Sequence, residues 1–430
     1  MDFILKKILI TILLIALPTL AVASPLTLEQ CLDRGLNFNP QIKAYQFAVA
    51  EAGQGVNEAW GGFLPSLSVH YNYTQLQNGS SGERDTDYLD QDSDAISVKV
   101  SQPLFRGFSS VATLKRARQS KQYRMAELTY IQQQLVREIS IKFYDLLYAT
   151  QRKQQWQNSL TRLEKQTQIA SAWVDQQLAP RLRLLEIQVE LSNVRHQVIL
   201  ASTDETIAQA QLRELLNFDI GHTMTVVGTL NSPNVPLCPD LSECLIKAKQ
   251  RPEITLAHFN VKMAREEAKI ILARNLPQAN LDASWVDYQR DYDNRDYTDD
   301  ERDYYSVTFN LSMPLFQGGR NISAWRKQRL AVDRLRQIEI KQTNAIASEV
   351  ESRYRQYVES KARITSANDS LIAAREAYAL VSRSTALGVK SLNDLLDSEL
   401  RLTRAELTVL ESNYAMQKAY VLLNCAVGGE

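Results

Sequence analysis

Glycine, proline, cysteine and histidine are all scarce in this chain of 430 residues, which has 15 Gly, 12 Pro, 4 Cys and 4 His. So little glycine and proline argues against an all-β protein, whose many turns use both residues. The histidines are scattered and the cysteines match no zinc-ligand spacing, so no metal site is predicted. Basic and acidic residues both number 49, and this balance excludes a chain drawn as a whole to nucleic acid or anionic lipid.

Catalytic motifs and long apolar segments are missing as well. The sequence contains no G-x-S-x-G, no H-E-x-x-H and no phosphate-binding loop. An exported hydrolase is therefore disfavoured, and the chain is predicted to be no enzyme and to need no cofactor. Beyond the first residues, no segment reaches the ~18 consecutive apolar residues that a membrane-spanning helix needs.

The first residues have the composition of a secretory signal peptide. Lys6 and Lys7 precede the short apolar run Ile8–Leu17, and Ala21-Val22-Ala23 forms a small-x-small cleavage site. Residues 1–23 are therefore predicted to be removed on export. The alternative is an uncleaved membrane anchor, which the shortness of the apolar run disfavours.

Two interpretations of the cysteines stay open. Export permits disulfides, and Cys238 and Cys244 are close enough in sequence to close a small loop. The other interpretation is that these two residues, like Cys31 and Cys425, are buried or reduced thiols. No pairing is assigned.

The strongest feature of the sequence is an internal duplication. Pro40 and Pro252 are 212 positions apart (252 − 40 = 212), and Leu64-Pro65 returns as Leu276-Pro277 at the same separation. The segment Gln102–Gly107, QPLFRG, returns as Met313–Gly318, MPLFQG, 211 positions later (313 − 102 = 211). The chain is therefore predicted to hold two structural repeats, 24–219 and 240–430, joined by a proline-punctuated extended linker, 220–239.

Both repeats have the same predicted order of elements. A short helix comes first, at 26–36 and 241–250. A second helix follows, with Pro40 or Pro252 in its first turn, and ends near residue 62 or 275. Two strands and then two long helices complete each repeat.

Two runs without glycine or proline, Phe108–Ala179 and Asn321–Leu387, predict unusually long helices. At a rise of 1.5 Å per residue each run extends about 100 Å, a length that implies coiled-coil packing. Apolar residues recur three or four positions apart along these helices and the one that follows the second of them. They are Leu128, Ile131, Leu135 and Ile139, then Ile346, Val350, Tyr354 and Val358, and finally Leu396, Leu400, Leu407, Leu410 and Tyr414.

Each long helix is predicted to turn back at a hairpin tip. The first tip is placed at Ala179-Pro180. The second is placed at Gly388-Val389, where glycine can adopt the left-handed conformation that ends a helix. Ser391 then caps the next helix, with Asp394 three residues further on.

The strand pairs alternate apolar and polar residues. The clearest example carries apolar residues at every second position from Tyr305 to Met313. Such alternation is typical of membrane barrels, and also of a soluble sheet with one solvated face, so alternation alone leaves both open. Four strands cannot close a barrel. If they cross a membrane, several chains must share one barrel, and three chains would supply twelve strands.

The segments that join the strands are acidic. Residues 83–94 hold six acids and one arginine, and residues 287–303 hold eight acids and three arginines. They are predicted to be solvent loops, facing the outside of the cell in the membrane interpretation. No EF-hand spacing occurs in them, so ion binding is not predicted.

The duplicated Pro-Leu-Phe segment is predicted to be structural and is called here the strand-to-helix swivel. Proline ends ladder pairing at the end of a strand. Glycine then lets the backbone turn from a tilted strand into an upright helix. The residues concerned are Pro103, Gly107, Pro314, Gly318 and Gly319.

Taken together, the duplicated order of elements resembles the TolC-like outer-membrane efflux family over nearly the whole mature chain. The most specific parts are Gln102–Gly107, Ser312–Gly319 and Gly388–Asp397. The resemblance implies a mainly α-helical protein with membrane β-structure. Long helical hairpins would form a periplasmic α-barrel, and four strands per chain would contribute to a trimeric, twelve-stranded outer-membrane β-barrel. It also implies docking to a periplasmic adaptor and an inner-membrane transporter, in efflux or type I secretion.

The resemblance also assigns functional positions. Asp394 and Asp397 match pore-lining acidic positions at the closed periplasmic end, Lys390 matches a basic gating position, and Glu186 falls near the corresponding place in the first repeat. Around a threefold axis, the two aspartates would put six carboxylates in one mouth, which attracts cations and should raise some carboxyl pKa values. The alternative for Asp394 is a plain helix cap with Ser391, and for Lys390 a solvated tip. The tip residues expected to meet the adaptor are Gly388, Val389, Ala179 and Pro180.

A soluble periplasmic coiled-coil adaptor is the alternative from another class. It would explain export and the hairpins. It does not explain two alternating strand pairs at matching places in the two repeats.

Overall fold

The computed structural model describes residues 25–76, 91–222, 224–230, 240–292 and 300–429. The predicted signal peptide and the centres of both acidic segments lie outside these ranges. The chain divides into two compact units. Unit 1 contains the described parts of 1–43, 131–249 and 346–430, and unit 2 contains those of 44–130 and 250–345. Each unit draws on both predicted repeats.

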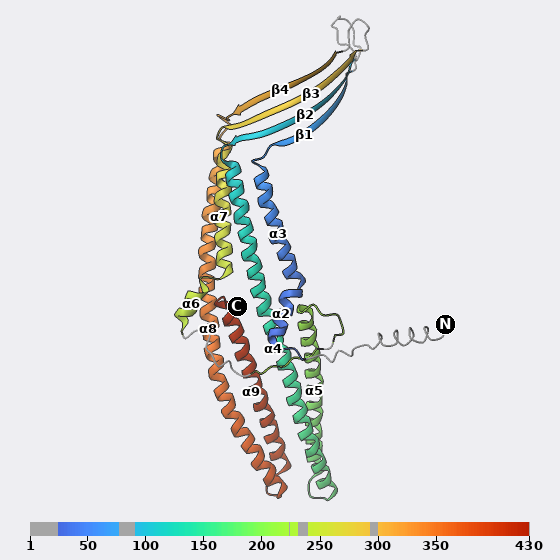
Figure 1. The fold of residues 1–430 in the computed structure, drawn as a ribbon. Helices are drawn as coiled ribbons and strands as arrows, with labels where there is room; N and C mark the ends of the chain where they lie inside the picture. The colour runs from blue at the N-terminus through green and yellow to red at the C-terminus, as the bar shows by residue number, and fades with distance from the viewer. Residues whose placement is uncertain (1–24, 77–90, 223, 231–239, 293–299, 430) are drawn as a thin grey trace, which may run out of the picture. The chain divides into compact units, whose positions relative to one another are not determined.

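Long helices dominate the chain, and four strands form its only multi-strand sheet within the described residues (Figure 1). In chain order the elements are α2 (Leu28–Phe38), α3 (Pro40–Gly61), β1 (Ser66–Leu76), β2 (Gln91–Arg106), α4 (Ser109–Asp175), α5 (Arg181–Leu215), α6 (Leu241–Ala248), α7 (Pro252–Ala273), β3 (Gln278–Tyr292), β4 (Asp300–Ser312), α8 (Arg320–Ala386) and α9 (Leu392–Ala426). Among the described residues, none of the helices combines the length and the apolar character needed to cross a bilayer.

Local sequence sets the starts of the shorter helices. Thr27 and Gln30 form a reciprocal capping box, so α2 begins at Leu28, two residues later than predicted. Asp240 caps α6 by accepting a hydrogen bond from the backbone N–H of Glu243. Pro252 is the first residue of α7, where its missing N–H costs nothing.

The core of unit 1 lies between the long helices. Ile131, Leu135 and Ile139 are buried, as the predicted stripe requires. On α8 the stripe was wrong at one point, because Val358 is 50% exposed and Tyr357 is buried instead. Steps of four residues turn 400°, so a repeated step of four drifts off the buried face, and a step of three is needed to return to it.

Part of the predicted linker makes backbone contacts. Leu26 and Val226 form an isolated parallel bridge. The Leu26 N–H donates to Thr225 O at 2.9 Å, and the Val227 N–H donates to Leu26 O at 3.0 Å. Residues 231–239, which hold its prolines, lie outside the described ranges.

The cysteine question is partly resolved. Cys244 is disulfide-bonded, so the thiol interpretation was wrong for it. Cys238, which is close enough in sequence to close a small loop with it, lies outside the described residues. Cys31 is a fully buried thiol, and burial raises its pKa to about 11.

The sheet of unit 2 has the order β1-β2-β3-β4, with every neighbouring pair antiparallel. The strands extend further into the acidic segments than predicted: β2 begins at Gln91, β3 continues to Tyr292 and β4 begins at Asp300. Apolar alternation fades where strand residues are polar on both faces, so it marks only the middle of such strands.

Candidate functional site at the hairpin tips

The two hairpin tips in unit 1 have the same backbone geometry. Five residues separate α4 from α5, and five separate α8 from α9. In each tip an amide bonds back to a carbonyl five residues earlier: Leu178 N to Trp173 O at 2.7 Å, and Val389 N to Ser384 O at 2.9 Å. This is the Schellman closure of a helix, which requires one residue in the left-handed conformation.

The first tip differs from its prediction. α4 ends at Asp175, four residues before Ala179, and the left-handed position is occupied by Gln177, with φ of 62°. Its counterpart in the second tip is Gly388, with φ of 73°. The break was predicted at Ala179-Pro180 because glycine and proline usually mark the end of a helix. Here a non-glycine residue, Gln177, adopts the left-handed conformation instead, at a cost of about 1 kcal/mol.

The helices that follow the tips are capped differently. Ser391 and Asp394 form a complete capping box: the Asp394 N–H donates to Ser391 Oγ at 3.2 Å, and the Ser391 N–H donates to Asp394 Oδ2 at 3.0 Å. The Ser391 hydroxyl also donates to Asp394 Oδ2 at 2.8 Å. Pro180 occupies the equivalent position before α5 and makes no side-chain cap. The second tip is thus the better anchored of the two.

The cap also sets the ionisation of Asp394. The Ser391 hydroxyl, then the Ser391 backbone N–H and the Lys390 charge, lower the pKa of the Asp394 carboxyl. Within one chain this carboxyl is therefore held ionised, opposite in direction to the rise predicted for a ring of carboxylates.

The predicted constriction residues of the second repeat lie along one groove of about 610 Å³ between α8 and α9. Lys390, Asp394 and Asp397 line it together with Arg401 and Arg404. Arg401 Nη2 lies 2.9 Å from Asp397 Oδ2, so one of the two carboxylates already has a cationic partner. The groove is mixed in charge rather than purely acidic.

The remaining predicted tip residues are placed as follows. Glu186, in the first turns of α5, pairs with Arg183 at 2.9 Å. Val389 is 75% exposed, and Pro180 is exposed. Ala179 is half-buried, because it packs against the apolar cluster of Ala170, Ile187 and Leu392 near the tips.

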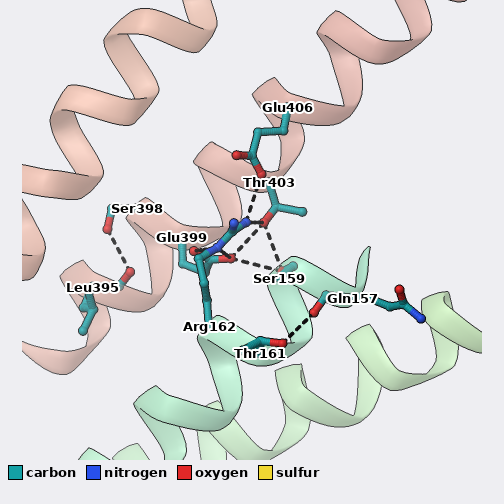
Figure 2. Close-up of polar contacts among 9 residues, drawn as sticks. All are labelled: Gln157, Ser159, Thr161, Arg162, Leu395, Ser398, Glu399, Thr403 and Glu406. Carbon is teal, nitrogen blue, oxygen red and sulfur yellow. Dashed lines mark hydrogen bonds and ion pairs between the residues drawn. The ribbon is translucent and has the colours of Figure 1, made fainter. Parts of the chain in front are cut away.

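Above the tips, a buried polar network joins α4 to α9 (Figure 2). Arg162 Nε donates to both carboxylate oxygens of Glu399, at 2.8 and 2.7 Å. Arg162 Nη2 donates to Thr403 Oγ1 and to Glu406 Oε2, each at 3.0 Å. The Ser159 hydroxyl completes the set by donating to Glu399 at 3.1 Å. We call these five residues the α4–α9 clamp.

Burial makes the Glu399 carboxylate of the clamp depend on its partners. Glu399 is fully buried, and burial raises the pKa of its carboxyl against the opposing hydrogen bonds from Arg162. A carboxylate in such a place is tolerated only with its partners present, because an unpaired buried charge is costly. Arg162 is therefore the residue on which this contact depends.

The clamp was not predicted, although the sequence contains one signal of it. Leu392, Leu395, Glu399 and Leu402 step by three, four and three, and all four are buried. An acidic residue at a core position of an amphipathic stripe predicts a buried partner of opposite charge. The partner, Arg162, is 237 residues from Glu399 in the sequence, and no local pattern indicates it.

The strand-to-helix swivels lie in unit 2. Contrary to prediction, Pro103 does not end its strand: β2 continues to Arg106 with a register shift between Pro103 and Phe105. Proline is accepted there because β1 begins only opposite Ser101, which leaves this end of β2 paired on one side alone. In the second swivel β4 ends at Ser312, before Pro314. Gly107 and Gly318 both have positive φ, 57° and 59°, and Gly319 has 75°.

The family comparison decides what kind of protein these elements form. The description "Outer membrane efflux protein" belongs to the family that matches residues 32–217 and 247–429. The chain belongs to the outer membrane efflux protein family. The two matched segments cover most of the chain.

Individual relatives agree with this assignment. The efflux protein is 21% identical to outer membrane protein TolC of Vibrio cholerae over 441 residues, which cover 99% of this chain and 96% of TolC. Among solved structures, the Campylobacter jejuni CmeC outer membrane channel matches with a TM-score of 0.81 and 13% identity, over 94% of this chain and 85% of CmeC. The open state of the Neisseria gonorrhoeae MtrE outer membrane channel matches with a TM-score of 0.78 and 17% identity, over 94% and 89%.

Family membership settles the broad predictions. The efflux protein is a channel component of the outer membrane with a helical periplasmic portion, and it is not an enzyme. The predicted fold class, long helical hairpins with four membrane strands per chain, is confirmed. The soluble adaptor alternative is not favoured.

Proposed function

We propose that three copies of this chain form a closed duct, which carries substrates across the outer membrane from an inner-membrane transporter and a periplasmic adaptor. The observation that carries the proposal is the sheet: β1 and β4 are its two edges, and in the part of the chain that the structure describes each pairs with one strand. An open edge is not tolerated in lipid, and closing it with further copies of the same sheet removes every edge. Four strands from each of three chains give the twelve strands predicted from sequence.

The duct is gated at the hairpin tips in this proposal. Asp394, Asp397, Lys390 and Glu186 line its narrowest part, and the exposed tips formed by Gly388, Val389, Ala179 and Pro180 receive the adaptor. Support comes from the exposure of Val389 and from the shared groove of Lys390, Asp394 and Asp397. Because Arg401 partly neutralises Asp397, the cation attraction of the mouth rests mainly on Asp394.

The α4–α9 clamp gives the gate its resting state. Opening requires the two hairpins of one chain to move apart or to twist, and the clamp ties α4 of the first hairpin to α9 of the second. A buried, multiply bonded ion pair is disrupted as a unit, which favours two discrete states over gradual loosening. The duct serves efflux or type I secretion.

The experiment that tests the duct is the oligomeric mass of the protein after extraction. We expect it to need detergent and to have the mass of three chains, with the trimer dissociating on heating in denaturing detergent. A water-soluble monomer would contradict the duct and would support the adaptor alternative instead.

A further inference from the structure

A groove between α7 and α8 in unit 2 is lined mainly by basic side chains. It has a volume of about 580 Å³, and all the residues that line it belong to this one compact unit. Five cations and two carboxylates line it, which gives a net charge of +3 (5 − 2 = 3). The cations are Lys262, Arg265, Lys269, Arg329 and Arg336. We call this the α7–α8 groove, and its charge suits an anionic ligand.

Helical spacing brings these cations together along the groove. Lys262, Arg265 and Lys269 follow one another at steps of three and four residues, so they share one face of α7. Arg329 and Arg336 are seven residues apart and share one face of α8 in the same way. An apolar cluster contributed by both helices holds α7 and α8 side by side (Figure 1). The two basic faces therefore belong to one packed pair of helices.

The charge of the groove is only partly neutralised within the chain. Its two carboxylates are already paired, Glu266 with Lys269 at 2.7 Å and Asp333 with Arg336 at 3.0 Å. The other three cations have no ion-pair partner in the part of the chain that the structure describes. They are Lys262, Arg265 and Arg329. Like charges gathered on two neighbouring helices repel one another, and a bound anion would remove that repulsion.

The groove lies close to the membrane end of unit 2. α7 ends at Ala273, shortly before β3, and α8 begins at Arg320, shortly after β4. At 1.5 Å per residue, Lys269 and Trp325 are about 6 and 8 Å along their helices from these ends. The headgroup layer of a bilayer is about 5–8 Å thick, and tryptophan is enriched at this depth. The long arginine side chains of the groove extend its reach toward the headgroups.

The sequence has the same sign of charge at the start of both long helices. Residues 109–126 of α4 hold five basic residues and no acid, and residues 320–332 of α8 hold four basic residues and no acid. The chain as a whole is balanced, so this positive charge is local to the membrane end of unit 2. Basic clusters directly beside a membrane segment attract anionic lipid.

We propose that the α7–α8 groove binds the headgroup of an anionic phospholipid from the leaflet that faces the periplasm. Arg265 and Arg329 bind the phosphate from the two helices, because a planar guanidinium group matches phosphate oxygens, and Lys262 adds a third charge. Gln119 Oε1 lies in the wall of the groove, shielded from solvent and without a hydrogen-bond partner among the described residues. It accepts a hydrogen bond from a headgroup hydroxyl. The site is complete within one chain and does not rest on the proposed ring of copies.

Native mass spectrometry of the full-length protein in detergent tests this site. The protein is mixed with phosphatidylglycerol, or with phosphatidylcholine that has the same acyl chains. Wild type should retain phosphatidylglycerol in preference, and a groove variant should retain about tenfold less of it, with no change for phosphatidylcholine. The groove variant combines Lys262→Gln, Arg265→Gln and Arg329→Gln.

A matched control removes the same charge from exposed positions of α8 in unit 1, far from the sheet in sequence, and should retain phosphatidylglycerol as wild type does. It combines Lys361→Gln, Arg375→Gln and Arg383→Gln. Arg265→Gln alone changes one exposed side chain, which rarely disturbs folding, and should give a smaller loss in the same direction.

The outcomes separate the groove from the duct. Unchanged phosphatidylglycerol retention in the groove variant and in Arg265→Gln would overturn the proposal, and so would an equal loss in the control variant. Glycerol 3-phosphate, which has no acyl chains, should not displace the lipid at equal concentration. Displacement would show that the groove takes a soluble phosphate ester and would overturn the lipid assignment. A monomeric mass in wild type would contradict the duct and leave the groove result valid.

Discussion

At the scale of single residues, the two tips differ at one left-handed position. Gly388→Ala should weaken the second tip by about 1 kcal/mol, because a Cβ is strained at φ of 73°. Gln177→Gly should relieve the same strain in the first tip and strengthen it by a similar amount. Hydrogen exchange of the amides of Leu178 and Val389 measures both effects. Equal exchange in wild type and both variants would show that neither tip depends on this conformation.

Ser391 makes the second tip sensitive to pH. Because the Asp394 pKa is lowered in the folded chain, its contribution to stability is fully present above the ordinary Asp value of about 3.9 and is lost as pH falls through the lowered folded value. Ser391→Ala should therefore speed amide exchange at the start of α9 at neutral pH. The difference from wild type should shrink below about pH 4. A difference that persists unchanged in acid would show that the cap does not work through the Asp394 charge.

The Ser391–Asp394 cap could be predicted from the sequence, and the α4–α9 clamp could not. Ser391 and Asp394 are three apart in sequence, so a local pattern contains both halves of the interaction. The clamp joins residues of two different hairpins, and only packing brings Arg162 to Glu399. Gln177 was missed for a third reason: its conformation follows from the closure of the loop, and glutamine itself has no preference for it.

At the scale of elements, the clamp should dominate the contact between α4 and α9. Arg162→Ala leaves Glu399 buried without its cation and should destabilise this contact by about 3 kcal/mol. Replacing both residues by methionine should restore much of the loss, since the fully buried charge of Glu399 is removed together with its partner. Urea denaturation combined with hydrogen exchange of α9 measures both.

A surface ion pair on the same helix is the matched control. Arg152 and Asp204 join α4 to α5 at 3.0 Å but are both substantially exposed. Arg152→Ala should lower the free energy of unfolding by less than about 1 kcal/mol. If Arg152→Ala and Arg162→Ala lower the free energy of unfolding equally, the burial of Glu399 does not make its ion pair more important than an exposed one.

The elements themselves were largely predictable. Runs without glycine or proline located α4 and α8 to within a few residues, and apolar alternation located the middles of the strands. Strand ends were not predictable, because Asp92, Asp94 and Asp300 lie on strands although their side chains resemble those of a loop. The stripe on α8 failed at Val358 because a fixed step of four does not follow a helix of 3.6 residues per turn.

At the scale of the whole molecule, a single chain leaves its sheet edges and one swivel without a partner among the described residues. Among the described residues, the sheet has no second neighbour at either edge, and the second swivel exposes Leu315 and Phe316. Both features are explained by further copies of the same chain arranged in a closed ring. The division into two repeats stays a prediction from sequence, and the compact units cut across it.

Planar-bilayer conductance of the detergent-purified trimer measures whether this ring is a gated channel. We expect small, cation-selective openings that divalent cations block, and weaker block in the double variant Asp394→Asn and Asp397→Asn. Asp369→Asn, at an exposed carboxylate on α8, should leave the block unchanged. A trimer that conducts no ions would contradict the account, and cation block unchanged in the double variant would remove these two residues from the constriction.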